Sequence, residues 1–284
     1  MPAFLLPFRF LSNINEGGNT LPNCKQNNKN KYIFSQNFLT NRRLIEKIVS
    51  LSTITKCDTV LEIGTGKGHL TGVLSQKCNF LFSIEIDEVL YHKSMIKLKK
   101  YNNIKLINDD FLSYSLPRKI SYKVFANIPF SITTQIIDKL TKAPNPPDEM
   151  WLIVEKGAAK RFTGIKKETI KSLLLKPNWE IDIIFHFRRD DFHPKPSKDS
   201  VLLHFYRKHI PDIAESEFGT YKKFIEQSFK YGLFKKKSLL TKKQIVTALK
   251  LAELPSISND GVILYIQWLC LFRCYIDFIE KQKM

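Results

Sequence analysis

Between residues 59 and 206 the sequence repeats one local pattern, in which a short apolar run is followed by a segment with helical spacing. The apolar runs suit β-strands because each is short and rich in Val, Ile, Leu and Phe. They read TVLEI (59–63), FLFSIEI (80–86), IKLIN (104–108), YKVFA (122–126), MWLIVE (150–155) and SVLLHFY (200–206). Strands that alternate with helices form mostly parallel sheets covered on both faces. The pattern therefore predicts a doubly wound α/β fold.

The two ends of the chain have different compositions. Residues 1–30 are rich in Asn, Gly and Lys, which predicts a flexible extension. After Pro211 the pattern becomes helical, in YKKFIEQSFKYGLF (221–234), TKKQIVTALKLAEL (241–254) and GVILYIQWLCLFRCYIDFIEK (261–281). We therefore expect an extension over 1–30, an α/β domain over 31–207 and a small all-helical domain over 208–284.

The charge balance indicates the kind of partner. The chain has 45 Lys and Arg against 27 Asp and Glu, a net charge of +18, which favours a polyanionic partner. The longest apolar run (261–272) is well short of the ~20 residues that a membrane-spanning helix needs, so nucleic acid is the better prediction. Five cysteines without a CxxC pair fit a reducing cytoplasm. Cys270 and Cys274 lie one helical turn apart, but no second ligand pair accompanies them, and no metal site is predicted.

A glycine-rich turn follows the first predicted strand, in DTVLEI-GTGKGHLTGVL (58–74). Gly64, Gly66 and Gly68 let the backbone turn tightly and approach a ligand. About twenty residues later the next strand closes with Glu85, where a carboxylate accepts hydrogen bonds from ribose hydroxyls. The spacing G-x-G-x-G differs from the dinucleotide and phosphate-loop patterns. A nucleoside cofactor without a pyrophosphate fits better, and S-adenosylmethionine is the common one.

A third strand ends in Asp109 and Asp110, where a carboxylate could hold the adenine amine of such a cofactor or could simply be solvated. A fourth ends in Asn127-Ile128-Pro129-Phe130. The exocyclic amine of adenine is a poor nucleophile, and two acceptors on its hydrogens would hold its nitrogen in line with a sulfonium methyl. The Asn127 side-chain oxygen and the Ile128 carbonyl can be these acceptors, with Pro129 fixing the backbone and Phe130 stacking on an extruded base.

Seven ordered segments together resemble the rRNA adenine dimethyltransferase superfamily. They are FSQNFLTN (34–41), VLEIGTGKGHL (60–70), IEID (84–87), NDDFL (108–112), ANIPF (126–130), LIVEKGAAKRF (152–162) and FHPKPSKDSVLL (192–203). The resemblance covers residues 31–207 and implies a Rossmann-like S-adenosylmethionine-dependent methyltransferase fold, with a seven-stranded, mostly parallel sheet. It also implies a small helical domain behind that fold.

The resemblance also implies roles for individual residues. Gln36, Asn37 and Leu39 would line the methionine end of the cofactor beside Gly64 and Gly66, and Glu85 would hold the ribose. Asp110, rather than Asp109, would sit by the adenine. Asn127 and Phe130 match the target-base pocket, and Phe192 matches a second aromatic residue beside that base. Phe130 stands where Tyr is commoner, so the stacking face is kept without the hydroxyl.

Within the superfamily the chain is most similar to the Erm branch, which methylates an adenine of 23S rRNA and confers macrolide, lincosamide and streptogramin B resistance. The small-subunit (KsgA-type) branch tends to have G-P-G, N-L-P-Y and F-x-P-P-P-K-V-D-S, which this chain replaces. That maturation enzyme remains the alternative, and a methyltransferase-fold protein that only binds nucleic acid is a second. The resemblance implies a cytoplasmic monomer that acts on rRNA.

Lysine and arginine side chains near the predicted site are candidates for RNA contact, although lysine runs are more often solvated faces. Two groups stand out, one after the sixth motif and one in the helical tail. They are Lys156, Lys160 and Arg161, and Lys235, Lys236, Lys237, Lys242 and Lys243.

Overall fold

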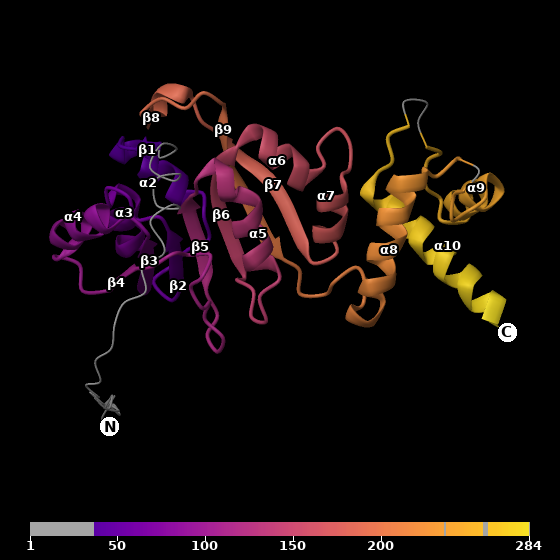
Figure 1. Ribbon diagram of the computed structural model, residues 1–284, viewed down its shortest axis with the longest axis horizontal. Helices are drawn as coiled ribbons and strands as arrows, with labels where there is room; N and C mark the ends of the chain where they lie inside the picture. Colours follow the sequence, from indigo (N-terminus) through magenta and orange to yellow (C-terminus); the bar gives the residue numbers. More distant parts are fainter. Residues whose placement is uncertain (1–36, 236, 258–260, 284) are drawn as a thin grey trace, which may run out of the picture. The chain divides into compact units, whose positions relative to one another are not determined.

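The computed structural model describes residues 37–235, 237–257 and 261–283, without the side chains of residues 279–283. The extension expected over residues 1–30 lies outside the described residues. A seven-stranded sheet in the order β4-β3-β2-β5-β6-β9-β7 forms the centre of the α/β part (Figure 1). Its strands are β2 (Thr59–Ile63), β3 (Phe80–Glu85), β4 (Ile104–Asn108), β5 (Lys123–Asn127), β6 (Glu149–Glu155), β7 (Trp179–His186) and β9 (Ser200–Arg207).

Most of the sheet is parallel, as the sequence predicts. Strands β4, β3, β2, β5 and β6 run parallel to one another, while β9 lies antiparallel between β6 and β7. The six strand-like runs named from the sequence are all confirmed. Strand β7 was missed, although Trp179 and Ile181 are buried and Glu180 and Asp182 exposed, which is the period-two pattern of an edge strand.

Helices cover both faces of this sheet because successive strand residues point to opposite sides. They are α2 (Arg42–Ser50), α3 (His69–Lys77), α4 (Glu88–Leu98), α5 (Thr133–Thr141), α6 (Lys156–Thr163) and α7 (Ile170–Leu175). Val60 packs in one buried cluster with α2 and α3, whereas its neighbour Leu61 packs in another with α5 and α6. At the start of α2 the Asn41 side chain accepts a hydrogen bond from the Leu44 amide.

Parallel pairing brings the carboxyl ends of neighbouring strands to one edge of the sheet. There, Glu85 of β3 pairs with Asn108 of β4, and Asn127 of β5 pairs with Ile153 of β6. A separate two-stranded ribbon joins β1 (Phe38–Leu39) to β8 (Phe192–His193), with Leu39 opposite Phe192. Polar residues that lie far apart in the sequence therefore meet at this edge.

After β9 the described chain is helical, in α8 (Glu215–Tyr231), α9 (Lys242–Leu251) and α10 (Tyr265–Lys283), as the sequence predicts. These helices share a core that includes Phe224, Trp268 and Phe272. The Tyr221 hydroxyl donates a hydrogen bond of 3.0 Å to the Leu173 carbonyl of α7. Among the described residues, none of the helices combines the length and apolar character needed to cross a bilayer.

Candidate active site

A cleft opens at the carboxyl ends of β2, β3 and β5, beside β1. It encloses about 690 Å³, part of which is open to solvent. This edge is where open α/β sheets bind ligands. The lining residues are Asn37, Phe38, Leu39, Gly64, Thr65, Gly66, Lys67, His69, Leu70, Glu85, Asn127, Ile128, Pro129 and Phe130. Segments that the sequence analysis linked only by their motifs thus meet around one space.

The glycine turn forms the floor of the cleft. Gly64 and Gly66 have φ angles of +81° and +54°, a region that residues with a side chain rarely adopt. A Cβ atom on Gly66 would lie 2.8 Å from the Phe38 ring, so the absence of a side chain lets Phe38 pack on the turn. The Lys67 ammonium lies 4.9 Å from the centre of the same ring. The turn therefore offers bare backbone to a ligand.

Glu85 lies beside this turn with its side chain buried. One carboxylate oxygen accepts a hydrogen bond of 2.7 Å from the Gly66 amide, and the other accepts one of 2.9 Å from the Asp87 amide. Burial raises the pKa of Glu85, although the Asp87 and Gly66 amides act in the opposite direction. Each oxygen retains a lone pair, so this carboxylate suits ribose hydroxyls.

A buried polar chain supports the glycine turn from below. The Ser83 hydroxyl donates to Glu62 Oε2 at 2.6 Å and lies 2.6 Å from the Thr65 hydroxyl, which lines the cleft. Glu62 is fully buried, and its Oε1 has no hydrogen-bond partner among the described residues. Burial raises the pKa of Glu62 to about 8, so this carboxyl is largely protonated at neutral pH.

The amide of Asn127 is held in one orientation. Its Nδ2 donates a hydrogen bond of 2.7 Å to the backbone carbonyl of Asn37, ninety residues earlier in the chain. Because the amide nitrogen is engaged in this way, Oδ1 is left as the acceptor, and it has no hydrogen-bond partner among the described residues. Asn127 is half-buried in the cleft wall. The contact shows how the N-terminal motif and the Asn-Ile-Pro-Phe segment form one unit.

The two residues after Ile128 continue the same wall. Pro129 has a φ of −61° and a ψ of 131°, which is extended backbone, and it precedes the short 3₁₀ turn η1 (Phe130–Ile132). Phe130 is half-buried and lines the cleft. An aromatic face is therefore available beside the Asn127 amide, as a stacking site for a base requires.

Two of the predicted site residues that the structure describes, Asp110 and Phe192, do not line the cleft. Gln36 lies outside the described residues. Asp110 follows the end of β4 and accepts a hydrogen bond of 2.9 Å from the Leu112 amide, which closes a local turn. Phe192 is buried, 4% exposed, and its ring packs 5.3 Å from that of Phe187. The proposed contacts of Asp110 with adenine and of Phe192 with the target base stay predictions.

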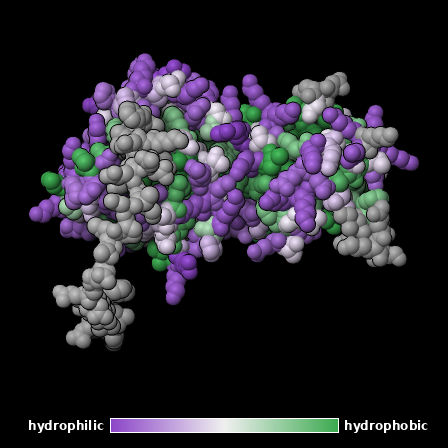
Figure 2. All heavy atoms as spheres, viewed as in Figure 1, coloured by the Kyte–Doolittle hydropathy of each residue, from purple (hydrophilic) through white to green (hydrophobic). Residues whose placement is uncertain are grey.

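The basic residues singled out from the sequence lie in two places. Lys160 and Arg161 are exposed on α6, and Lys156 begins this helix directly after the carboxyl end of β6, the strand next to β5. Lys235, Lys237, Lys242 and Lys243 are exposed around the start of α9, and Lys236 lies outside the described residues. Hydrophilic residues cover much of the face shown in Figure 2.

Sequence reasoning assigned no role to several residues that line the cleft, among them Phe38, Lys67 and His69. All three lie inside the quoted motifs, so proximity to assigned residues was the available signal. Burial lowers the pKa of His69, and the neighbouring Lys97 and Lys67 charges act in the same direction. Within the described part of the chain, no group of three or more His, Cys, Asp or Glu side chains is placed to hold a metal.

A seven-stranded, mostly parallel sheet with a glycine turn at one strand end and a buried acid at the next matches the fold of S-adenosylmethionine-dependent methyltransferases. Comparison with known proteins narrows this class. Residues 27–268 match the family of ribosomal RNA adenine dimethylases. The chain therefore belongs to this family and is an S-adenosylmethionine-dependent rRNA adenine methyltransferase.

Curated relatives agree with this assignment. An rRNA adenine N-6-methyltransferase of Lysinibacillus sphaericus is 37% identical over 86% of this chain and 96% of its own length. One from Staphylococcus aureus is 35% identical over 85% of this chain and 95% of its own. The crystal structure of the 23S rRNA methyltransferase ErmE has a TM-score of 0.76 and 27% identity, over 84% of this chain and all of that one. The predicted family and fold are thus confirmed.

Proposed function

We propose that the protein transfers methyl groups to the exocyclic amine of one adenine in 23S rRNA, and that this modification blocks binding of macrolides, lincosamides and streptogramin B. The similarity to ErmE supports the large subunit as the substrate. The sequences Gly64-Thr65-Gly66 and Asn127-Ile128-Pro129-Phe130 also differ from the small-subunit pattern. The protein would act as a cytoplasmic monomer on naked or assembling rRNA.

The observation that carries this proposal is the fixed Asn127 amide in the cleft shared with Glu85 and the glycine turn. In this arrangement Asn127 Oδ1 and the Ile128 carbonyl each accept a hydrogen bond from one N–H of the adenine amine, and Phe130 stacks on the extruded base. Bound S-adenosylmethionine supplies an activated methyl group. Asn127 Oδ1 and the Ile128 carbonyl would hold the amine nitrogen towards that carbon, so that it could take the methyl group while the departing sulfur keeps the bonding pair and one amine proton is lost to water.

The cleft fits the cofactor. Bare backbone at Gly64 and Gly66 permits close approach of its methionine part, and Glu85 would accept hydrogen bonds from the ribose. Asn37 and Leu39 close the cleft from β1. Asp110 would contact the adenine. The exposed lysines of α6 and of the helical region from residue 208 on would contact rRNA phosphates, which makes that region an RNA-binding domain.

One experiment tests the choice of substrate. The protein is incubated with methyl-labelled cofactor and, separately, with naked large-subunit and small-subunit rRNA, and the modified base is then mapped. We expect label at a single adenine of the large-subunit RNA. Label found in small-subunit RNA alone would contradict the proposal and identify a maturation enzyme. Cofactor binding without label in either RNA would favour a protein that only binds nucleic acid.

A further inference from the structure

A second cleft lies on the other side of the glycine turn, among α2, α3 and the end of α4, which are grouped at the indigo and purple end of the sheet (Figure 1). It encloses about 550 Å³, part of which is open to solvent. Its lining includes Arg42, His69, Lys97 and Lys100 but no carboxylate. Nothing in the catalytic arrangement uses the Arg42, Lys97 and Lys100 cations, so their convergence needs another explanation.

The lysines around this cleft have no carboxylate beside them in the cleft lining. Lys97 donates a hydrogen bond of 2.7 Å to the Lys67 carbonyl, and in the described part of the chain neither it nor Lys100 has an ion pair with a carboxylate. Burial lowers the pKa of Lys97, and the nearby Lys100 and Lys67 charges lower it further. Like charges held this close repel one another, and a bound anion would relieve that repulsion.

The cleft is partly open to solvent, so an extended ligand can reach the cations at its rim. The Arg42 side chain is 70% exposed at the rim, where Glu46 holds it at 2.7 Å. Tyr101 forms part of the wall, with the Lys100 ammonium 5.2 Å from its ring centre. Gly72 leaves room for the Tyr101 hydroxyl, because a Cβ atom at position 72 would lie only 3.3 Å from that oxygen. An open rim with exposed cations is what a phosphodiester backbone requires.

His69 lines both clefts, so the second one borders the catalytic cleft directly. We propose that the second cleft binds a backbone phosphate of the RNA substrate, within a few nucleotides of the adenosine that enters the catalytic cleft. This proposal rests on the proposed function in taking large-subunit rRNA as the ligand. The cleft would position the strand, and its residues take no part in methyl transfer itself.

Charge-matched double variants test the proposal. R42Q/K100Q removes two cleft cations, whereas R43Q/K99Q removes the exposed residues next to them, which do not line the cleft. We expect R42Q/K100Q to weaken binding of a large-subunit rRNA fragment by about tenfold relative to R43Q/K99Q, and to lower the salt slope of binding by about 1 to 2. Equal weakening in the two variants would overturn the proposal. Both variants should keep the melting temperature and the cofactor affinity of the parent protein, which would exclude a folding defect.

Lysine footprinting of the unmutated protein gives an independent readout. With an amine-reactive reagent, the RNA fragment should protect Lys97 and Lys100. It should leave Lys93 of α4 and Lys99, which directly follows α4, reactive. Protection by inorganic phosphate alone, with none added by RNA, would assign the cleft to a small anion and refute the proposal. If labelled methyl reached neither rRNA while the protection persisted, the proposed function would fail and the RNA contact would stand.

Discussion

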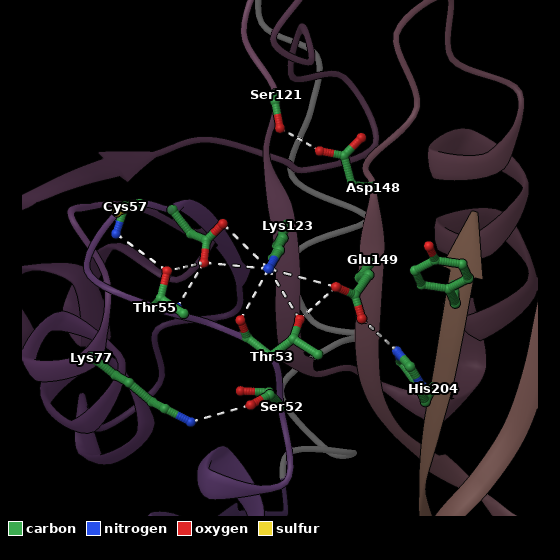
Figure 3. A network of polar contacts seen from close by, with 12 residues as sticks. Ser52, Thr53, Thr55, Cys57, Lys77, Ser121, Lys123, Asp148, Glu149 and His204 are labelled. Atoms are coloured by element: carbon green, nitrogen blue, oxygen red, sulfur yellow. Dashed lines mark hydrogen bonds and ion pairs between the residues drawn. The ribbon is translucent and has the colours of Figure 1, made fainter. Parts of the chain in front are cut away.

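Polar groups at the amino ends of the parallel strands pair with one another, whereas polar groups at the carboxyl ends face a cleft. At the amino ends, Lys123 of β5 donates to the Thr53 carbonyl at 3.0 Å and pairs with Asp58 and Glu149 at 3.3 and 3.5 Å. Glu149 in turn accepts a hydrogen bond from His204 at 3.0 Å (Figure 3). At the carboxyl ends, Asn127 Oδ1, the bare glycine turn and the Glu85 lone pairs face a cleft.

This difference distinguishes polar groups that stabilise the fold from polar groups that are available to a ligand. The amino-end groups satisfy one another, so their charge serves the fold and leaves nothing to offer a ligand. Burial acts to raise the pKa of Asp58, but hydrogen bonds from Thr55 and Lys123 together outweigh it and hold the pKa below its usual value. The carboxyl-end groups are fixed in place yet incompletely satisfied, which is the condition of a preorganised site.

The largest expected effect comes from Asn127→Ala. Loss of an acceptor that acts at the reacting nitrogen should lower kcat by about 10²–10³-fold, equivalent to roughly 3–4 kcal/mol, while cofactor binding stays largely intact. Methyl incorporation into rRNA and calorimetric cofactor affinity measure the two quantities. Asn108→Ala serves as the control. It removes a side-chain amide at the end of β4 that donates a hydrogen bond to the backbone carbonyl of Glu85, and activity should stay within a few-fold of normal. Near-normal turnover of Asn127→Ala would refute the role.

Gly66→Ala should weaken cofactor binding by about 100-fold. The new Cβ would meet the Phe38 ring, and alanine is strained at a φ of +54°. Adding Phe38→Leu should restore only part of the affinity, because the backbone strain remains. Gly219→Ala in helix α8 is the matched control, since the added Cβ would have no atom within 4 Å apart from its chain neighbours and the nearby backbone of its own helix. An unchanged cofactor affinity in Gly66→Ala would contradict the close approach of backbone and ligand.

At the other end of the strands, Lys123→Met should lower the free energy of unfolding by roughly 2 kcal/mol, because it leaves the buried Glu149 without its cation. Activity per folded molecule should not change. Denaturant unfolding and initial rates report these two quantities, and Lys119→Met removes an exposed lysine as the control. A loss of turnover in the folded variant would show that the amino-end network influences the site.

The last prediction concerns the pH dependence of stability and uses Glu62→Gln. The folded protein keeps the Glu62 proton up to a pKa of about 8, whereas the unfolded chain releases it near 4.5. Stability conferred by this group therefore falls as pH rises between those values, by at most about 1.4 kcal/mol per pH unit. The variant should lose that slope and gain stability relative to the parent near pH 8. Parallel stability curves for the two proteins from pH 5 to 8 would contradict protonation of Glu62.

The sequence predicted much of the α/β fold because apolar runs and helical spacing are local signals. Strand β7 was missed where Glu180 and Asp182 interrupt the apolar residues of an edge strand. The cleft was predicted through its motifs, but Phe38 and the Asn127–Asn37 bond were not, since both depend on contacts between segments far apart in the chain. Lys123 and Glu149 likewise show no local sign of their pairing.

The most direct test is a crystal structure with the demethylated cofactor product and an RNA fragment that carries the target adenosine. The adenine amine nitrogen should lie about 3 Å from both Asn127 Oδ1 and the Ile128 carbonyl oxygen, with the Phe130 ring stacked on the base. A base bound elsewhere, or an Asn127 amide that turns its oxygen away from the amine, would contradict the account.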